Sequence, residues 1–246
     1  MPMFSLKTYE HLIRSLGATA RPFVTFARGS AGLALRLDVD YDLALAAAVA
    51  AINQRLGVRG TFFIQVSSAV YNACSPADRQ AIAQIGEAGQ FIGLHHDARG
   101  TVLDSDQLQR EYDVLERLTP QVQRVVAWHN PPADTASLDA AAEKAGFLST
   151  YCPEFFGPDR YVSDSNCRHR AEQIAAFAGA CRAPLVQVLL HPVIWSFDAD
   201  GMEDVLAALF GAKVNQLGRD FMQNRLWTNA LCQRALRMLD AEVRKA

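Results

Sequence analysis

Acidic and imidazole side chains recur where apolar segments of the chain end. Asp38 and Asp40 lie in Leu-Asp-Val-Asp, and residues 93–97 read Gly-Leu-His-His-Asp. Two further histidines, His129 and His191, each directly follow another apolar segment. Carboxylate oxygens and imidazole nitrogens bind divalent ions such as Zn, Mn, Fe, Co and Ni. An ion of this kind can polarise a carbonyl and lower the pKa of water to about 7, which is what hydrolysis of an amide or ester requires.

The segments around these side chains alternate between two patterns. Short runs of β-branched and apolar residues end at each polar group, and segments with helical spacing and capping residues lie between them. The predicted strands are 22–26, 33–39, 60–66, 90–94, 124–128, 147–151 and 185–190, and the predicted helices are 4–16, 43–56, 75–88, 105–118, 135–145 and 172–179. Residues 152–168 look rich in loops, and 202–244 look helical. Such alternation is typical of a parallel sheet, whose carboxyl-terminal edge gathers active-site residues.

Composition places the chain among ordinary globular proteins. Half of its 246 residues are hydrophobic and its formal net charge is −2, which disfavours nucleic acid as a partner. The apolar stretch 44–52 has about half the length of a membrane span, and the first residues lack the pattern of a signal peptide. The five cysteines are scattered without a CxxC pair, which fits free thiols in a reducing compartment. We expect a cytoplasmic protein with no membrane span, and an oligomeric state stays open.

Three motifs together resemble the polysaccharide deacetylase (NodB-homology) superfamily. They are LRLDVDY at 35–41, GTFF at 60–63 and GLHHD at 93–97. They are most similar to a divergent bacterial branch that has His-Asp-Val-Asp in the first motif and is linked to surface-polysaccharide loci. Shorter matches follow at 128–131, 161–165 and 189–195, so the resemblance covers about residues 4–197.

This resemblance implies an α/β fold, an irregular (β/α) barrel of the NodB-homology type with a helical C-terminal extension. We expect one deacetylase-like domain over 1–246, with the barrel in 1–200 and the helical segment in 201–246. The implied activity is metal-dependent hydrolysis of an N- or O-acetyl group on a sugar or sugar conjugate in surface-polysaccharide biosynthesis, for O-antigen or capsule. The implied cofactor is a divalent metal ion, with zinc preferred over Mn, Fe, Co or Ni.

The resemblance also assigns roles to single residues. Asp38 falls on the metal-binding acid and His95 falls on the first metal-binding histidine. His191, in Leu-Leu-His, falls on the late general acid. The usual position of the general base falls on Leu37, and leucine cannot move a proton, so either Asp40 takes this role or the base is absent.

The second metal-binding histidine of the family falls on Arg99, four residues after His95. Three residues could replace it as a ligand, namely His96, Asp97 and His129. His96 is the least favoured, because it is expected to point to the other face of its strand. Asp97 shares a face with His95 on extended backbone, and it ranks equally with His129.

Trp128, Trp195 and Asp164 are candidate substrate-binding residues. The two tryptophans flank predicted site histidines, and aromatic faces suit the packing of a sugar ring, although both could equally fill the core. Asp164 lies between two serines and could support the site or cap a turn.

Four arginines have two interpretations each. Arg36 lies between apolar neighbours in the first motif, and it could pair with a site carboxylate or face solvent. Arg160, Arg168 and Arg170 belong to the loop-rich region, where they could meet a phosphate, as on a nucleotide-linked sugar, or be solvated.

Leu37 and Arg99 also support a second hypothesis. A catalytically degenerate relative would keep the fold and bind a glycan intermediate or a biosynthetic partner. A third interpretation is a metal-dependent hydrolase of a C–N bond outside sugars. For the enzyme, the expected partner is a small or conjugated sugar, activated or lipid-linked rather than a finished wall polymer.

Overall fold

The computed structural model describes residues 2–99, 105–132 and 134–222, together with residues 230, 233–235 and 237–238. The chain divides into two compact units, Met1–Gly201 and Met202–Ala246. The second unit contains helix α8 (Met202–Met222). Most of the helix predicted beyond Met222 lies outside the described residues. No helix in the described part of the chain is long and apolar enough to cross a membrane.

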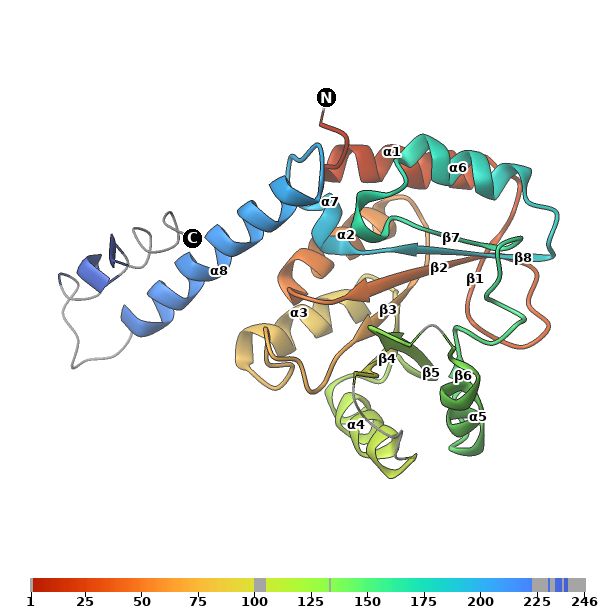
Figure 1. Cartoon of the computed structure of the whole chain (residues 1–246), viewed down its shortest axis with the longest axis horizontal. Helices are drawn as coiled ribbons and strands as arrows, with labels where there is room; N and C mark the ends of the chain where they lie inside the picture. Colours follow the sequence, from red (N-terminus) through yellow and green to blue (C-terminus); the bar gives the residue numbers. More distant parts are fainter. Residues whose placement is uncertain are drawn as a thin grey trace. The chain divides into compact units, whose positions relative to one another are not determined.

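A single curled sheet forms the framework of the first unit (Figure 1). Its strands are β1 (Phe23–Val24), β2 (Gly32–Val39), β3 (Thr61–Ile64), β4 (Phe91–Asp97), β5 (Val122–His129), β6 (Leu148–Ser149), β7 (Tyr161–Ser163) and β8 (Leu185–Leu190). Their order is β6-β5-β4-β3-β2-β8-β7, with β1 also paired to β2, and every pairing between these strands is parallel. The sheet forms a half-barrel with surrounding helices, which confirms the predicted α/β fold of the NodB type.

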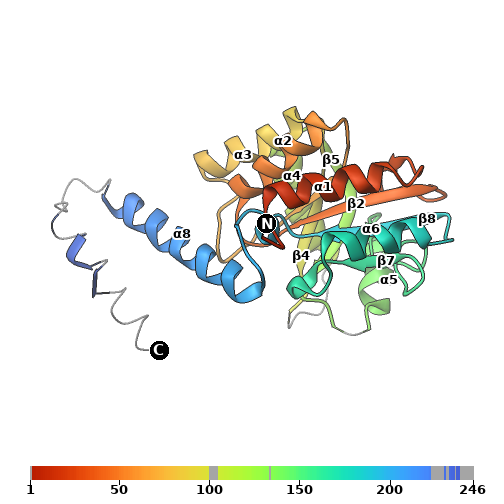
Figure 2. The same ribbon diagram turned by 90° about the horizontal axis from the view of Figure 1, so that it is seen from above.

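The helices of the first unit mostly follow strands and lie around the sheet. They are α1 (Leu6–Gly17), α2 (Leu43–Arg55), α3 (Pro76–Glu87), α4 (Ser105–Leu118), α5 (Ala136–Lys144), α6 (Ala171–Ala180) and the short α7 (Pro192–Trp195). Figure 2 shows α1 beside α6 and α2 beside α3. Helix α2 begins where it was predicted, because an Asp42 oxygen accepts hydrogen bonds from the amides of Ala44 and Leu45.

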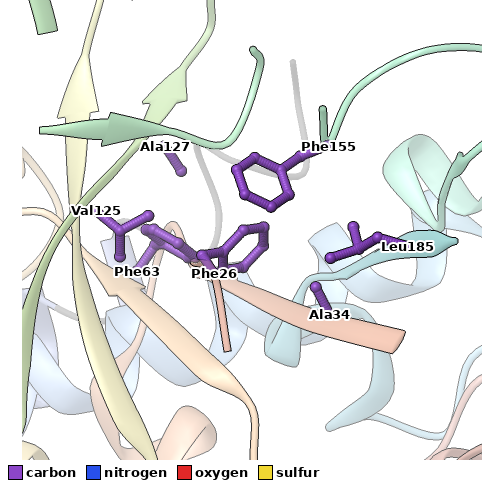
Figure 3. Packing of buried hydrophobic residues seen from close by; sticks show 7 residues of the cluster. All are labelled: Phe26, Ala34, Phe63, Val125, Ala127, Phe155 and Leu185. Carbon is purple, nitrogen blue, oxygen red and sulfur yellow. The ribbon is translucent and has the colours of Figure 1, made fainter. Parts of the chain in front are cut away.

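An apolar cluster fills the inner face of the curled sheet (Figure 3). It consists of Phe26, Ala34, Phe63, Val125, Ala127, Phe155 and Leu185. The ring of Phe26 packs edge-on against Phe63 and Phe155, with centroids 5.8 and 5.2 Å apart. Strand residues alternate between the two faces of a sheet. A residue that lies an even number of positions beyond a cluster residue in the same strand therefore also points to the inner side. The cluster is therefore the floor below the polar residues at the carboxyl ends of the strands.

Every predicted strand except β8 differs from its predicted extent by one to three residues at one end or both, and two differences matter for the site. Strand β4 continues to Asp97, whereas the prediction ended it at Leu94. His95 and His96 are therefore consecutive strand residues that must face opposite sides. Strand β7 lies inside the stretch that was predicted to be loop-rich, and with three residues it is too short for its alternation to be read from sequence.

Candidate metal centre

Asp40, His95 and His129 meet at the carboxyl-terminal edge of the sheet. Oδ1 of Asp40 lies 3.0 Å from Nε2 of His95 and 3.2 Å from Nδ1 of His129. The two imidazole rings meet edge-on with centroids 5.1 Å apart. One oxygen and two ring nitrogens of this trio all lie within 4.8 Å of one another, close enough to share one metal ion.

The hydrogen bonds of His95 fit the role of a metal ligand. Its Nδ1 lies 3.0 Å from the carbonyl oxygen of Ala127, which can only accept, so Nδ1 carries a proton. In the neutral ring, Nε2 then presents a lone pair to Oδ1 of Asp40. When the ring is protonated, Nε2 donates to this carboxylate instead, and metal-binding histidines commonly hold their other nitrogen on a backbone carbonyl in this way. The set of two imidazoles and one carboxylate suits zinc and similar divalent ions.

The carboxyl group of Asp40 is held in its charged form. Burial acts to raise its pKa, but hydrogen bonds with His129 and His95, and the nearby His191, hold this pKa far below its usual range. An ionised carboxylate is the form that binds a metal ion.

Asp38 lies beside this trio in an ion pair with Arg36. Its two oxygens accept hydrogen bonds from Nε and Nη2 of Arg36 at 2.8 and 2.6 Å, and Oδ2 lies 3.7 Å from Nε2 of His95. Burial acts to raise the pKa of Asp38, but the charge and hydrogen bonds of Arg36, together with the nearby His95 and His191, lower this pKa. The predicted ligand Asp38 is therefore ion-paired with Arg36. Of the two interpretations of Arg36, the structure supports pairing with a site carboxylate.

Arg36 has no exposed surface and is held from several sides. Besides Asp38, it donates to Oγ1 of Thr150 at 3.0 Å and to the hydroxyl of Tyr151 at 3.3 Å. Its guanidinium also lies 4.8 Å from the centroid of the Tyr151 ring. Thr150 and Tyr151 were not predicted for the site, because they follow β6 and only the curl of the sheet brings them to β2.

His191 reaches the same site from the end of β8. Its Nδ1 lies 2.6 Å from Oδ1 of Asp164, and its backbone amide donates to Oδ2 of Asp164 at 2.9 Å. The other ring nitrogen, Nε2, lies 3.8 Å from Oδ2 of Asp40. Burial acts to lower the pKa of His191, but the charge and hydrogen bond of Asp164, together with the charges of Asp40 and Asp38, outweigh burial and raise this pKa to about 9. His191 is therefore a protonated imidazole aimed at the trio.

The remaining ligand candidates lie elsewhere. Asp97 accepts hydrogen bonds from the backbone and guanidinium of Arg99, at 3.0 and 2.7 Å, and does not join the trio. His96 points to the opposite face, where its Nδ1 lies 2.8 Å from Oε2 of Glu111. Of the three alternatives for the second histidine ligand, the structure brings only His129 to the trio.

The predicted substrate contacts need correction. Trp128 and Trp195 are 1% and 0% exposed, so neither ring has a face available to a sugar. Their indole N–H groups donate to Asp139 and Asp164 instead, at 3.0 and 2.6 Å. Asp164 is also 0% exposed, so it acts on the site through His191 rather than by touching substrate.

Comparison with known proteins finds similarity among solved structures alone. No protein-family model and no curated protein matches the chain. A CE4 family pseudoenzyme from Bacillus anthracis matches at 16% identity and a TM-score of 0.48, over 77% of this chain and 63% of that chain. The chitin deacetylase from Colletotrichum lindemuthianum matches at 17% identity and 0.47, over 75% and 84%. A family 4 acetyl xylan esterase from Clostridium thermocellum, in complex with a cobalt ion, matches at 16% and 0.48, over 73% and 84%.

The chain spans less than two thirds of the length of the Bacillus anthracis protein. Among solved structures, the chain is therefore similar at low identity to a CE4 family pseudoenzyme, a chitin deacetylase and a family 4 acetyl xylan esterase.

Proposed function

We propose that this protein is a metal-dependent hydrolase that removes an acetyl group from a sugar or sugar conjugate, in the cytoplasm, during surface-polysaccharide biosynthesis. The observation that carries the proposal is the trio of Asp40, His95 and His129, with Nε2 of His191 3.8 Å from Asp40. The trio would hold a divalent ion, zinc before Mn, Fe, Co or Ni. Such an ion would polarise the acyl carbonyl and lower the pKa of water at the site.

In this proposal the two acids exchange the roles that the motifs suggested. Asp40 becomes a ligand, because its Oδ1 faces both His95 and His129. Asp38 becomes the carboxylate that orients the attacking water and accepts its proton, since its Oδ2 lies 3.7 Å from Nε2 of His95. Arg36 keeps Asp38 ionised and holds it in one orientation.

His191 is the proton donor to the leaving group. Its Nδ1 is held by Asp164, so only Nε2 is free to turn toward the substrate. The Asp164 charge stabilises the imidazolium form, which can protonate a departing amine or alkoxide. The apolar cluster on the inner face of the sheet limits the access of water to the site from that side.

The test measures acetate release from a panel of N- and O-acetylated sugars by the zinc-loaded full chain. We expect release that a chelator abolishes and that Asp40→Asn and His95→Gln each remove. Asp97→Asn is the matched control, because it removes a nearby carboxylate that lies outside the trio. Acetate release that persists in Asp40→Asn, or its absence from the parent on every sugar, would contradict the proposal.

One observation favours the alternative of a glycan-binding protein without catalysis. Both oxygens of Asp38 are engaged by Arg36, which weakens this carboxylate as a base, and Leu37 cannot replace it. The same panel separates the two functions. A non-catalytic protein would bind an acetylated sugar, and this sugar would be recovered unchanged after prolonged incubation with the protein and metal.

A further inference from the structure

A short basic segment, Arg168–Arg170 (Arg-His-Arg), lies at the same edge of the sheet as the trio. Strand β7 runs parallel to β8, with Ser163 opposite Leu189. The carboxyl end of β7 therefore lies beside the end of β8, where His191 stands. The segment begins five residues after Ser163 and ends directly before helix α6.

A sharp turn keeps the basic segment at this edge. Residues Ser165–Cys167 form a single turn in which Asn166 and Cys167 have left-handed φ angles of 55° and 56°. After the turn, Nδ1 of His169 lies 2.7 Å from the carbonyl oxygen of Ser163, which ties the segment back to the end of β7. The chain thus reverses direction here and does not continue past the edge.

The basic segment is also near the proton donor. Arg168 is four residues after Asp164, so their Cα atoms are separated by at most about 14 Å even on extended backbone. Asp164 itself contacts His191 directly at 2.6 Å. A long arginine side chain at this position can reach a group attached to a sugar whose acetyl group lies at the trio.

Among the described residues, the two arginines of this segment lack the ion pairs that six other arginines form. Both are exposed, and in the described portion of the chain no carboxylate forms an ion pair with either of them. Other arginines do have acidic partners, namely Arg14, Arg28, Arg36, Arg55, Arg99 and Arg160. The nearest acid toward the strand, Asp164, is buried and bound to His191 and Trp195. The segment therefore presents two exposed guanidinium groups at the same edge of the sheet as the site, and the nearest acid along the chain is Glu172 in the first turn of α6.

We propose that Arg168 and Arg170 bind a phosphate group carried by the sugar substrate. This inference rests on the proposed function, and it narrows the substrate class to a phosphorylated sugar. Guanidinium groups match the geometry of phosphate oxygens and donate paired hydrogen bonds to them. A nucleotide-linked sugar and a lipid-diphosphate-linked sugar share this chemistry.

The test measures binding to the metal-free full chain by calorimetry, so it does not depend on turnover. The probes are N-acetylglucosamine, N-acetylglucosamine 1-phosphate, UDP-N-acetylglucosamine and an isoprenoid-diphosphate-linked N-acetylglucosamine. We expect the phosphorylated probes to bind at least about tenfold more tightly than the plain sugar, since one charge-assisted contact contributes this much. Higher salt should reduce the difference. The last two probes distinguish the nucleotide from the lipid source.

Two double variants test whether these arginines cause the preference for phosphorylated probes. The double variant Arg168→Gln/Arg170→Gln should lose the preference for phosphorylated probes and keep the affinity for the plain sugar. The matched control is Arg59→Gln/Arg182→Gln, which removes two exposed arginines that precede β3 and β8 at the opposite edge of the sheet. This control should keep the preference. Thermal unfolding of both variants checks that they fold.

Two results would overturn the inference. One is equal affinity of the parent for the plain and phosphorylated sugars, and the other is equal loss of preference in the test and control variants. Acetate release without phosphate preference would leave the proposed function standing and remove this inference. Phosphate preference without acetate release would instead support the binding assignment and count against the hydrolase.

Discussion

Nε2 of His95 faces Oδ1 of Asp40 at 3.0 Å, while Nδ1 of the same ring bonds to the backbone carbonyl of Ala127 at 3.0 Å. The backbone carbonyl thus fixes Nδ1 as a donor and leaves Nε2 as the nitrogen that faces the site. His129 approaches the same Asp40 oxygen at 3.2 Å from the neighbouring strand. The arrangement of these atoms is suited to a cation.

The first prediction concerns metal affinity. Asp40→Asn and His129→Gln should each weaken zinc binding by more than about 100-fold, because removing a direct ligand costs more than disturbing its supporting hydrogen bonds. Competition with a chromogenic chelator measures the affinity. Asp97→Asn should bind zinc like the parent, because Asp97 is bound to Arg99. A loss of similar size in Asp97→Asn would mean that this acid moves to the metal.

A second prediction concerns the buried ion pair of Arg36 and Asp38. Arg36→Met should lower the free energy of unfolding by about 3–5 kcal/mol, because it leaves Asp38 buried without its counter-charge. Urea denaturation of the metal-free protein measures this change. Adding Asp38→Asn to Arg36→Met should restore a large part of the loss. If the double variant is less stable than Arg36→Met alone, the ion pair is not the source of the effect.

A third prediction separates proton transfer from metal binding. His191→Ala should lower the turnover number by about 10²–10⁴-fold, the usual contribution of a positioned acid, and leave the metal content unchanged. Asp164→Asn should lower turnover in the same direction, because it removes the group that orients His191. His11→Ala, on the exposed side of α1, is the control. Normal turnover in His191→Ala would exclude it from the reaction.

A fourth prediction concerns pH and the back of strand β4. Burial acts to raise the pKa of Glu111, but the hydrogen bond and charge of His96, with hydrogen bonds from Gln107 and Ser67, outweigh burial and lower this pKa below the usual 4.5 of a glutamate. The ionised form therefore stabilises the fold above pH 4.5, and this contribution is lost as pH falls through the lowered value.

The variant Glu111→Gln tests this dependence. It should lower the free energy of unfolding at pH 7 by about 1.5–3 kcal/mol, the range for hydrogen bonds to a charged group. At a pH below the lowered pKa the parent and the variant should converge in stability. A difference in unfolding free energy that stays constant from neutral to acid pH would show that the charge of Glu111 is not responsible.

Local features of the fold could be predicted from the sequence, because short-range interactions determine them. The bounds of β8 and of α4 agree with the structure residue by residue. Asp42 could be identified as the start of α2, since a helix cap depends only on amides two and three residues away. The alternation of apolar strands and helices likewise predicted the parallel sheet.

The sequence predicted which residues gather at the candidate site, because these residues lie at the ends of predicted strands. Parallel strands place their carboxyl ends at one edge, so Asp38, His95, His129 and His191 could be expected near one another before any distance was known. Their individual roles could not be predicted in this way. The motif resemblance made Asp38 the ligand, whereas the side chain that meets both histidines is Asp40.

Tertiary structure decided the partner of each side chain. Sequence spacing alone could not show that Arg36 folds back onto Asp38, or that the curl of the sheet brings Tyr151 to the same guanidinium. It also could not show that Trp128 and Trp195 turn into the core. The sequence by itself determined the elements and the edge where the polar groups gather, because these depend on local bonding and strand direction. Only the packed barrel determined which atoms meet, because strand register and side-chain burial depend on contacts between distant segments.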